Sequence, residues 1–324
     1  MKKVFIIFQV LILIMISVTA CSTQKPEGYP LSVNGTPIDG EIFRYYIDDV
    51  WNSPEAGGGK DGRITQATYK CIRYVAVNST FAAYGLSLTD DEKSLLAEEV
   101  NSLWNMFGTH YKNIGVSKET FLKIKTSDAY IEKLRIAFFD KGGTDEISDA
   151  VLRGILLDKY IAFRYIRVPL TVTDVYGNEQ PLSEADIARL NTVFNKALTQ
   201  ATSQYGIENA YITISQDFPF AEQTFETVVA GSDDHEFSSV FYDKIKSVAE
   251  GNASVFQYED YVYLVYRVNI LTDPLIFADK RDECLKIVSE DPLKSKINVM
   301  CNAYTSVREP SLVNEYYNKV GNNR

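Results

Sequence analysis

Apolar side chains between Ile38 and Tyr160 recur at intervals of three and four residues, which is the spacing that buries one face of an α-helix. One helix is predicted over residues 64–84. The next opens on a capping box, in which the side chains of Thr89 and Glu92 satisfy the first backbone amides. Thr144 is expected to cap a later helix that runs through Tyr160. We therefore predict that this region is almost entirely helical.

From Phe163 onward the period changes from helical to alternating. Residues 163–170 (FRYIRVPL) and 258–270 (YEDYVYLVYRVNI) read as strands, and residues 210–214 (AYITI) as a strand or part of a long connection. A capping signature at Ser183 opens a helix between them. After this α+β unit the chain is predicted to be helical again, with a break at Asp291-Pro292.

The N-terminus has the build of an export signal. Two lysines precede an apolar run over residues 4–18, which is too short for a comfortable membrane span. The run ends in Val18-Thr19-Ala20-Cys21, which resembles the bacterial lipobox, so residues 1–20 are predicted to be a lipoprotein signal peptide. Cys21 is then the lipid attachment residue, and residues 21–30 form a polar tether. An ordinary secretory signal with an incidental cysteine is the alternative.

The folded part is expected to open at residue 31 with a small hairpin, because Asn34-Gly35 between two short apolar stretches is a strong signal of a tight turn. If Cys21 carries lipid, three cysteines remain, so at most one disulfide can form. Cys284 and Cys301 could pair. Cys71 lies among apolar residues at helical spacing and is predicted to be a buried, unreactive thiol.

Composition excludes several function classes. The 324 residues are 45% hydrophobic, which is enough for two compact domains, and the formal net charge of -10 disfavours nucleic acid as a partner. The chain has two histidines, His110 and His235, both expected to be exposed at loops or helix ends. With so few histidines we expect no metal site. The sequence has no phosphate-binding glycine loop, so we expect no small-molecule cofactor either.

Two local stretches carry a resemblance to a known family. Residues 163–168 (FRYIRV) resemble the first strand of a parvulin-type prolyl isomerase domain, usually Ala-Arg-His-Ile-Leu-Val. Gly251, Ser254 and residues 262–268 (VYLVYRV) resemble its closing stretch, where a Gly-x-x-Ser turn precedes Gly-Tyr-His-Ile-Ile-Lys-Val. With the export signal and the helical block, the order of parts resembles the SurA and PrsA type of extracytoplasmic foldase.

The resemblance implies an α+β fold class with three parts after the tether. Residues 31–160 would be a helical, chaperone-like domain, residues 161–272 a small parvulin-like α+β domain, and residues 273–324 a C-terminal helical segment that packs back on the helical domain. It also implies a location outside the cytoplasm, lipid-anchored to a bacterial cell membrane. The expected partners are unfolded or partly folded exported proteins.

This sequence departs from the family at both histidines. Aligned without gaps, the first-strand histidine position is Tyr165 and the last-strand position is Leu264, and residues 225–234 lack the family's Gly-Asp-Leu-Gly segment. Leu264 can neither donate nor accept a hydrogen bond. We therefore expect a parvulin-like domain without isomerase activity, in which Tyr165 is a packing residue or part of a peptide-binding surface.

Aromatic residues are the candidate peptide-binding groups. The resemblance places a client-binding cleft in the helical block, where Trp104, Phe107 and Phe121 are candidates, and Phe220 is a candidate in the α+β unit beside Tyr165. For each of them taken singly, ordinary core packing is the simpler interpretation.

Two other functions stay open. The first is an active prolyl isomerase with a variant site, formed by Tyr165 with Asp217, Phe218 and Phe220. The second is a lipoprotein that captures a small solute, although such receptors show alternating strands and helices over two similar lobes, and here no strand interrupts the helical block.

Overall fold

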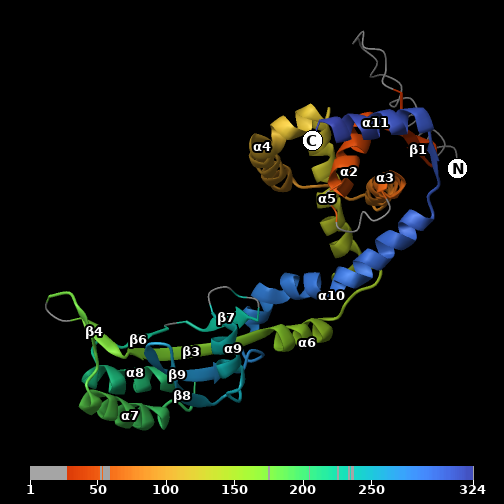
Figure 1. The fold of residues 1–324 in the computed structure, drawn as a ribbon. Helices are drawn as coiled ribbons and strands as arrows, with labels where there is room; N and C mark the ends of the chain where they lie inside the picture. Colours follow the sequence, from red (N-terminus) through yellow and green to blue (C-terminus); the bar gives the residue numbers. More distant parts are fainter. Residues whose placement is uncertain are drawn as a thin grey trace. The chain divides into compact units, whose positions relative to one another are not determined.

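The structure is a computed structural model that describes residues 28–51, 53, 59–173, 176–203, 205–224, 226–232, 234 and 237–323. The predicted signal peptide, Cys21 and most of the tether lie outside these residues. The fold is mixed α and β, as the sequence predicts, and its described residues form two compact units (Figure 1). Unit 1 comprises the residues up to Leu134 and from Lys294 onward, and unit 2 comprises Arg135–Leu293.

Unit 1 is mainly helical, with one small sheet. Its elements are β1 (Leu31–Val33), β2 (Thr36–Ile38), α2 (Gly40–Trp51), α3 (Gly59–Ala83), α4 (Asp90–Asn113), the first part of α5 (Lys118–Phe139), the last part of α10 (Pro274–Asn302), β10 (Ser306–Arg308) and α11 (Pro310–Asn322). The sheet has the order β10-β1-β2, and both pairings are antiparallel. The chain therefore returns to unit 1 after unit 2. There β10 pairs with β1, and Val313, Tyr316 and Val320 of α11 lie in the hydrophobic core of the unit.

Local signals in the sequence explain two features of unit 1. Asn34 and Gly35 both have positive φ, as the tight turn between β1 and β2 requires, and the Asn34 side chain accepts a hydrogen bond from the backbone N–H of Thr305 (2.8 Å). At the start of α4, Thr89 Oγ1 accepts from the Glu92 amide while a Glu92 carboxylate oxygen accepts from the Thr89 amide. Both predictions are confirmed.

Unit 2 is built on one antiparallel sheet. Its elements are the last part of α5, α6 (Asp149–Lys159), β3 (Tyr160–Pro169), β4 (Thr171–Thr173), β5 (Glu179–Pro181), α7 (Glu184–Leu198), α8 (Gly206–Asp217), β6 (Glu222–Gln223), β7 (Val228–Gly231), α9 (Ser239–Lys246), β8 (Ala253–Tyr258), β9 (Tyr261–Val268) and the first part of α10. The strand order is β6-β3-β9-β8, with β7 also paired to β3. Every strand pairing in the described chain is antiparallel, which gives no support to a solute-receptor fold.

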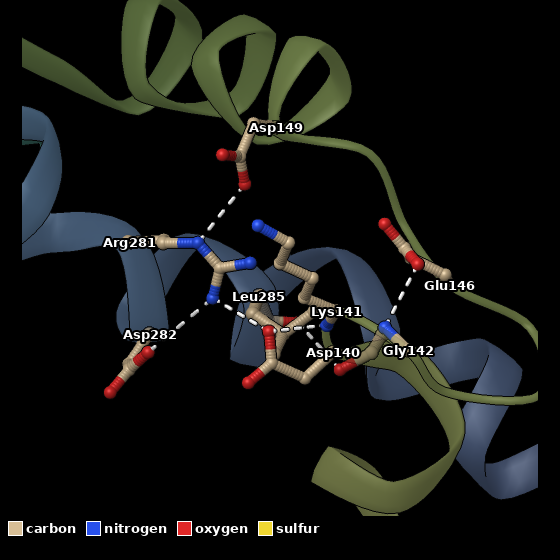
Figure 2. A network of polar contacts seen from close by, with 9 residues as sticks. Asp140, Lys141, Gly142, Glu146, Asp149, Arg281, Asp282 and Leu285 are labelled. Atoms are coloured by element: carbon tan, nitrogen blue, oxygen red, sulfur yellow. Dashed lines mark hydrogen bonds and ion pairs between the residues drawn. The ribbon is translucent and has the colours of Figure 1, made fainter.

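An arginine joins three segments of unit 2 at one point (Figure 2). Arg281 of α10 donates from Nη1 to Asp140 Oδ1 (2.7 Å), just after α5, and from Nε to Asp149 Oδ1 (3.0 Å), at the start of α6. Nearby, Arg135 of α5 donates to the Lys286 carbonyl (2.8 Å) and to Ser289 Oγ (3.1 Å) of α10. These contacts lie within unit 2, whose boundaries fall inside α5 and α10.

Several predicted elements differ in the structure. Residues 210–214 lie in helix α8, because Ile207, Ala210 and Ile214 are buried together at helical spacing. Residues 258–270 are not one strand but the end of β8, a turn at Glu259 with φ 48°, and β9. Pro292 does not break α10, and Thr144 does not cap α6, whose N-cap residue is Ser148.

The three described cysteines are free thiols. Cys71 is fully buried in the unit 1 core, and burial raises the pKa of its thiol well above the usual range, so its predicted character is confirmed. Cys284 and Cys301 lie on the same helix, and at about 1.5 Å per residue they are ~25 Å apart along its axis, too far to pair.

No helix among the described residues is long and apolar enough to cross a membrane.

Candidate functional site

The register of β3 and β9 decides which side chains share a face of the unit 2 sheet. Tyr165 is paired with Val265, Ile166 with Leu264, and Arg167 with Tyr263. Directly opposite residues of an antiparallel pair point to the same face, and neighbours along a strand point to opposite faces. Tyr165, Arg167 and Tyr263 therefore share one face, and Leu264 lies on the other.

Different helices cover the two faces. On the Tyr165 face, Phe163 packs edge-on against Phe241 of α9, with ring centroids 6.4 Å apart. On the opposite face, the buried Arg164 reaches Glu208 of α8 (3.4 Å) and the Thr224 carbonyl (3.3 Å). Helix α9 thus bounds the face that carries Tyr165, and α8 covers the face that carries Leu264.

A cavity of about 210 Å³ opens on the Tyr165 face. It is lined by residues of β3, of the start of α9 with the segment before it, and of the β8–β9 hairpin. These residues are Tyr165, Arg167, Phe237, Ser238, Phe241, Tyr258, Glu259 and Tyr263. We call this cavity the sheet pocket.

Aromatic rings form most of the walls of the sheet pocket. The Tyr263 ring contacts the rings of Tyr165 and Phe241, at centroid distances of 5.7 and 4.9 Å. Phe241 also contacts Tyr258 (5.1 Å) and stacks on Phe237 (5.7 Å). The Tyr258 hydroxyl is hydrogen-bonded to Ser238 Oγ, which is the N-cap of α9 (2.5 Å). The walls are therefore large apolar surfaces held by contacts with one another.

One cation lies at the rim of the sheet pocket, and it is already paired. Arg167 donates from Nε to Glu222 Oε2 (2.7 Å), and its guanidinium lies 4.6 Å from the centre of the Tyr261 ring. Burial lowers the pKa of Arg167, but the hydrogen bonds to Glu222 and Tyr263 outweigh it and raise the pKa above its usual value. Burial also raises the pKa of Tyr263, so its phenol stays protonated at neutral pH.

The described residues that line the sheet pocket include no imidazole and no metal-binding set. Among the described residues no group of three or more His, Cys, Asp or Glu side chains could hold a metal ion. His110 is on α4 in unit 1, where its Nε2 lies 2.9 Å from Asp48 Oδ2, and His235 is outside the described residues. The described lining can therefore bind apolar groups and offer phenol or hydroxyl hydrogen bonds, and none of its described residues is a histidine that could donate or accept a proton.

The structure brings together only some of the predicted site residues. Tyr165 lines the sheet pocket, whereas Leu264 is fully buried on the opposite face. Asp217 ends α8, Phe218 is buried against Arg189 of α7, and Phe220 packs on Phe218 and is 39% exposed. None of these three lines the pocket beside Tyr165, so the proposed variant isomerase site is not assembled here.

The aromatic candidates of unit 1 separate into packed and exposed residues. Phe121 is buried, and Trp104 packs against it and against Tyr111 at 5.8 and 6.0 Å, so the packing interpretation fits both. Phe107 is 47% exposed on α4. Of the three aromatic candidates in the helical block, Phe107 is therefore the most accessible to a partner.

Sequence reasoning missed Tyr263, Phe241, Tyr258 and Phe237 as pocket residues. Signals for two of them were present in the sequence, because Phe237 and Phe241 are four residues apart, which is the spacing of one helix face. What was lacking was the register between the two strands, which places Tyr263 and not Leu264 beside Tyr165.

Comparisons with known proteins give a distant structural likeness. No family model matches the chain, and no curated protein matches it. The chain is similar to the foldase protein PrsA from Streptococcus pneumoniae, at 14% identity and a TM-score of 0.31, over 78% of this chain and 85% of that one. It is also similar to PrsA from Bacillus subtilis, at 12% identity and a TM-score of 0.24, over 80% of this chain and 84% of that one. The function is therefore inferred below from the residues of this chain.

Proposed function

We propose that this protein is a lipid-anchored chaperone of the extracytoplasmic space that binds unfolded or partly folded exported polypeptides without catalysing prolyl isomerisation. The observation that carries the proposal is the composition of the sheet pocket, whose described residues give aromatic walls and phenol and hydroxyl donors and include no histidine. The signal-like N-terminus and Cys21 support the export and the anchor.

The sheet pocket suits an apolar or aromatic side chain of an unfolded client. Its aromatic walls offer a large contact area, and such rings lose little conformational entropy on binding because they are already packed against one another. The phenol hydroxyls of Tyr165 and Tyr263 suit the amide groups of the same client backbone.

Catalysis of isomerisation is not expected from this lining. The uncatalysed barrier is about 20 kcal/mol, and lowering it requires hydrogen-bond donors that are oriented towards the twisted amide. Arg167 is engaged by Glu222, and Leu264, at the other family position, faces away from Tyr165. The groups that remain bind a chain but do not form an oriented network around a proline.

Unit 1 carries exposed apolar side chains on helix α4. Helix α4 buries only Val100 and Gly108 fully, while Leu95, Met106 and Phe107 are 66%, 65% and 47% exposed. These side chains are accessible to an unfolded client.

The test uses the chain from Ser22 to Arg324, which contains every described residue. Two activities are measured: suppression of the aggregation of an unfolded test protein, and cis-to-trans isomerisation of a proline tetrapeptide. We expect suppression of aggregation with isomerisation at the uncatalysed rate. Clear catalysis of isomerisation would overturn the proposal that the protein lacks isomerase activity. Failure to suppress aggregation would overturn the proposal that it is a chaperone.

A matched pair of variants tests whether the sheet pocket contributes. Tyr263→Ala removes a ring that lines the pocket, and Tyr205→Ala removes a ring of unit 2 that is 79% exposed and does not line the pocket. Suppression should weaken several-fold in the first variant only. Equal behaviour of the two would remove the sheet pocket from the proposal.

A further inference from the structure

A second cavity, also of about 210 Å³, lies within unit 1. It is formed by three helices, α2, α3 and α5, and is far more polar than the sheet pocket. Its lining residues are Tyr45, Tyr46, Asp49, Lys70, Arg73, Tyr74, Val77, Ile124, Lys125, Ser127, Asp128 and Ile131. We call it the helix cavity.

The charges of the helix cavity leave one cation in excess. Lys70 is paired with Asp49 (2.6 Å), and Lys125 lies 3.6 Å from Asp128. Arg73 of α3 makes no hydrogen bond and no ion pair with any described residue, although its charge acts on Asp128 from a longer distance. A guanidinium carries several donors in a planar fork, so Arg73 is an unused anion-binding group on the cavity wall.

Three phenol groups line the same cavity as Arg73. Tyr45 and Tyr46 of α2 and Tyr74 of α3 line the helix cavity, and their hydroxyls form no hydrogen bond with any described residue. Burial, the main cause, raises the pKa of all three phenols, so at neutral pH they are protonated and able to donate. The cavity thus combines one surplus positive charge with uncommitted neutral donors.

We propose that the helix cavity binds a carboxylate of a polypeptide, with the guanidinium of Arg73 as its ion-pair partner and the tyrosine hydroxyls as additional donors. A single negative charge matches the single excess positive charge. A phosphate, with nearly two negative charges, would meet repulsion from Asp49 and Asp128 that the one surplus cation does not offset. Arginine also matches the planar geometry of a carboxylate.

The carboxylate has two possible sources in a polypeptide, an acidic side chain or the free C-terminus. That the ligand is a polypeptide rests on the proposed function, whereas the carboxylate preference rests on the helix cavity alone. The experiment therefore separates the two with a small ligand that needs no chaperone activity.

The small-ligand arm compares N-acetylglycine with N-acetylglycinamide, which differ only in the carboxylate. Both are titrated into the Ser22–Arg324 chain while the side-chain Nε–H resonance of Arg73, assigned with an Arg73→Lys variant, is followed by NMR. We expect a saturable shift with N-acetylglycine and none with the amide. Absence of the shift with N-acetylglycine overturns the proposal.

The peptide arm uses one neutral sequence in three labelled forms: amidated, with a free C-terminus, and amidated with one internal glutamate. Fluorescence anisotropy should show tighter binding of one or both carboxylate forms, on the order of tenfold, as expected for one charge-assisted hydrogen-bonded pair. The form that gains affinity identifies the source. If N-acetylglycine binds but no peptide does, the helix cavity binds carboxylates, and the proposal that its ligand is a polypeptide is overturned. The proposed function fails separately, if the same chain does not suppress aggregation.

A matched variant distinguishes binding in the helix cavity from attraction by the overall charge of unit 1. Arg73→Gln should remove the advantage of the carboxylate forms, and Arg73→Lys should keep part of it. Lys112→Gln removes the same charge from an exposed position of α4 outside the cavity and should leave the advantage unchanged. An equal loss in Arg73→Gln and Lys112→Gln would overturn the proposal. Circular dichroism of each variant confirms that it is folded.

Discussion

Tyr165 and Leu264 lie on opposite faces of the β3–β9 strand pair, because Tyr165 is paired with Val265 while Leu264 is paired with Ile166. The neighbour of Tyr165 in the sheet pocket is Tyr263, with ring centroids 5.7 Å apart. Family-type alignment of the two strands puts Leu264 in the role of a partner for Tyr165. In the structure residue 264 points to the opposite face of the sheet, so no side chain at this position can be the partner of Tyr165.

Replacing Leu264 with histidine should therefore destabilise the protein without creating a site. Leu264 is fully buried. An imidazole at this position loses the apolar packing of the leucine and has no hydrogen-bond partner arranged for it. We expect Leu264→His to lower the free energy of unfolding by ~2–4 kcal/mol, measured by urea denaturation. Tyr165→His, at a half-buried position that faces the sheet pocket, should cost about 1 kcal/mol. Similar costs in the two variants would argue against the opposite-face placement.

The hydroxyl of Tyr165 should be dispensable. No described residue forms a hydrogen bond with it, and the contacts of Tyr165 are those of its ring and backbone. Tyr165→Phe is thus expected to change the free energy of unfolding by less than about 0.5 kcal/mol and to leave proline tetrapeptide isomerisation at the uncatalysed rate. A wild-type protein that catalyses isomerisation and slows on this substitution would assign the hydroxyl to catalysis.

Features that depend on a few adjacent residues were predictable from the sequence. The Asn34-Gly35 turn follows from the positive φ that both residues adopt readily, and the start of α4 follows from a reciprocal exchange between Thr89 and Glu92. In each case the partners are within three residues of one another. No information about the rest of the fold is needed to place them.

Features decided by distant partners were not predictable. Residues 210–214 alternate well enough for a strand, but they are helical because α8 packs on the sheet, as the contact between Glu208 and Arg164 shows. Pro292 normally costs a helix about 3 kcal/mol, yet α10 continues through it with Leu285, Ser289 and Leu293 buried around it. The sheet pocket was missed for the same reason, since the strand register lies outside any local window.

The capping box of α4 gives a prediction with an internal control. Thr89→Ala removes the acceptor of the Glu92 amide and should lower the free energy of unfolding by ~1 kcal/mol. Ser148 is the N-cap residue of α6, but its side chain makes no capping hydrogen bond, so Ser148→Ala should cost clearly less. Equal losses in urea denaturation would mean that the Thr89 hydrogen bond contributes no more than an ordinary polar contact.

The Arg281 contacts make the stability of unit 2 depend on pH through Asp140 (Figure 2). Partial burial raises the pKa of Asp140, but hydrogen bonds from the Lys141 amide and from Arg281 outweigh it, so the pKa lies below its ordinary value of 3.8. A carboxyl whose pKa is lowered by folding stabilises the folded state above its unfolded pKa. That stabilisation is lost as the pH falls through the folded pKa.

Asp140→Asn is therefore expected to lower the free energy of unfolding by ~0.5–1 kcal/mol at about pH 7, and by less at about pH 3, where the wild-type carboxyl begins to be protonated. Urea denaturation of both proteins at the two pH values measures the difference. The control is Asp282→Asn, because Asp282 lies 3.9 Å from the same guanidinium nitrogen and is 95% exposed, so its removal should have no measurable effect at either pH. A loss in Asp140→Asn that stays constant with pH would show that its ionised carboxyl is not the stabilising group. The loss would then be attributed to the geometry of the loop that begins at Asp140.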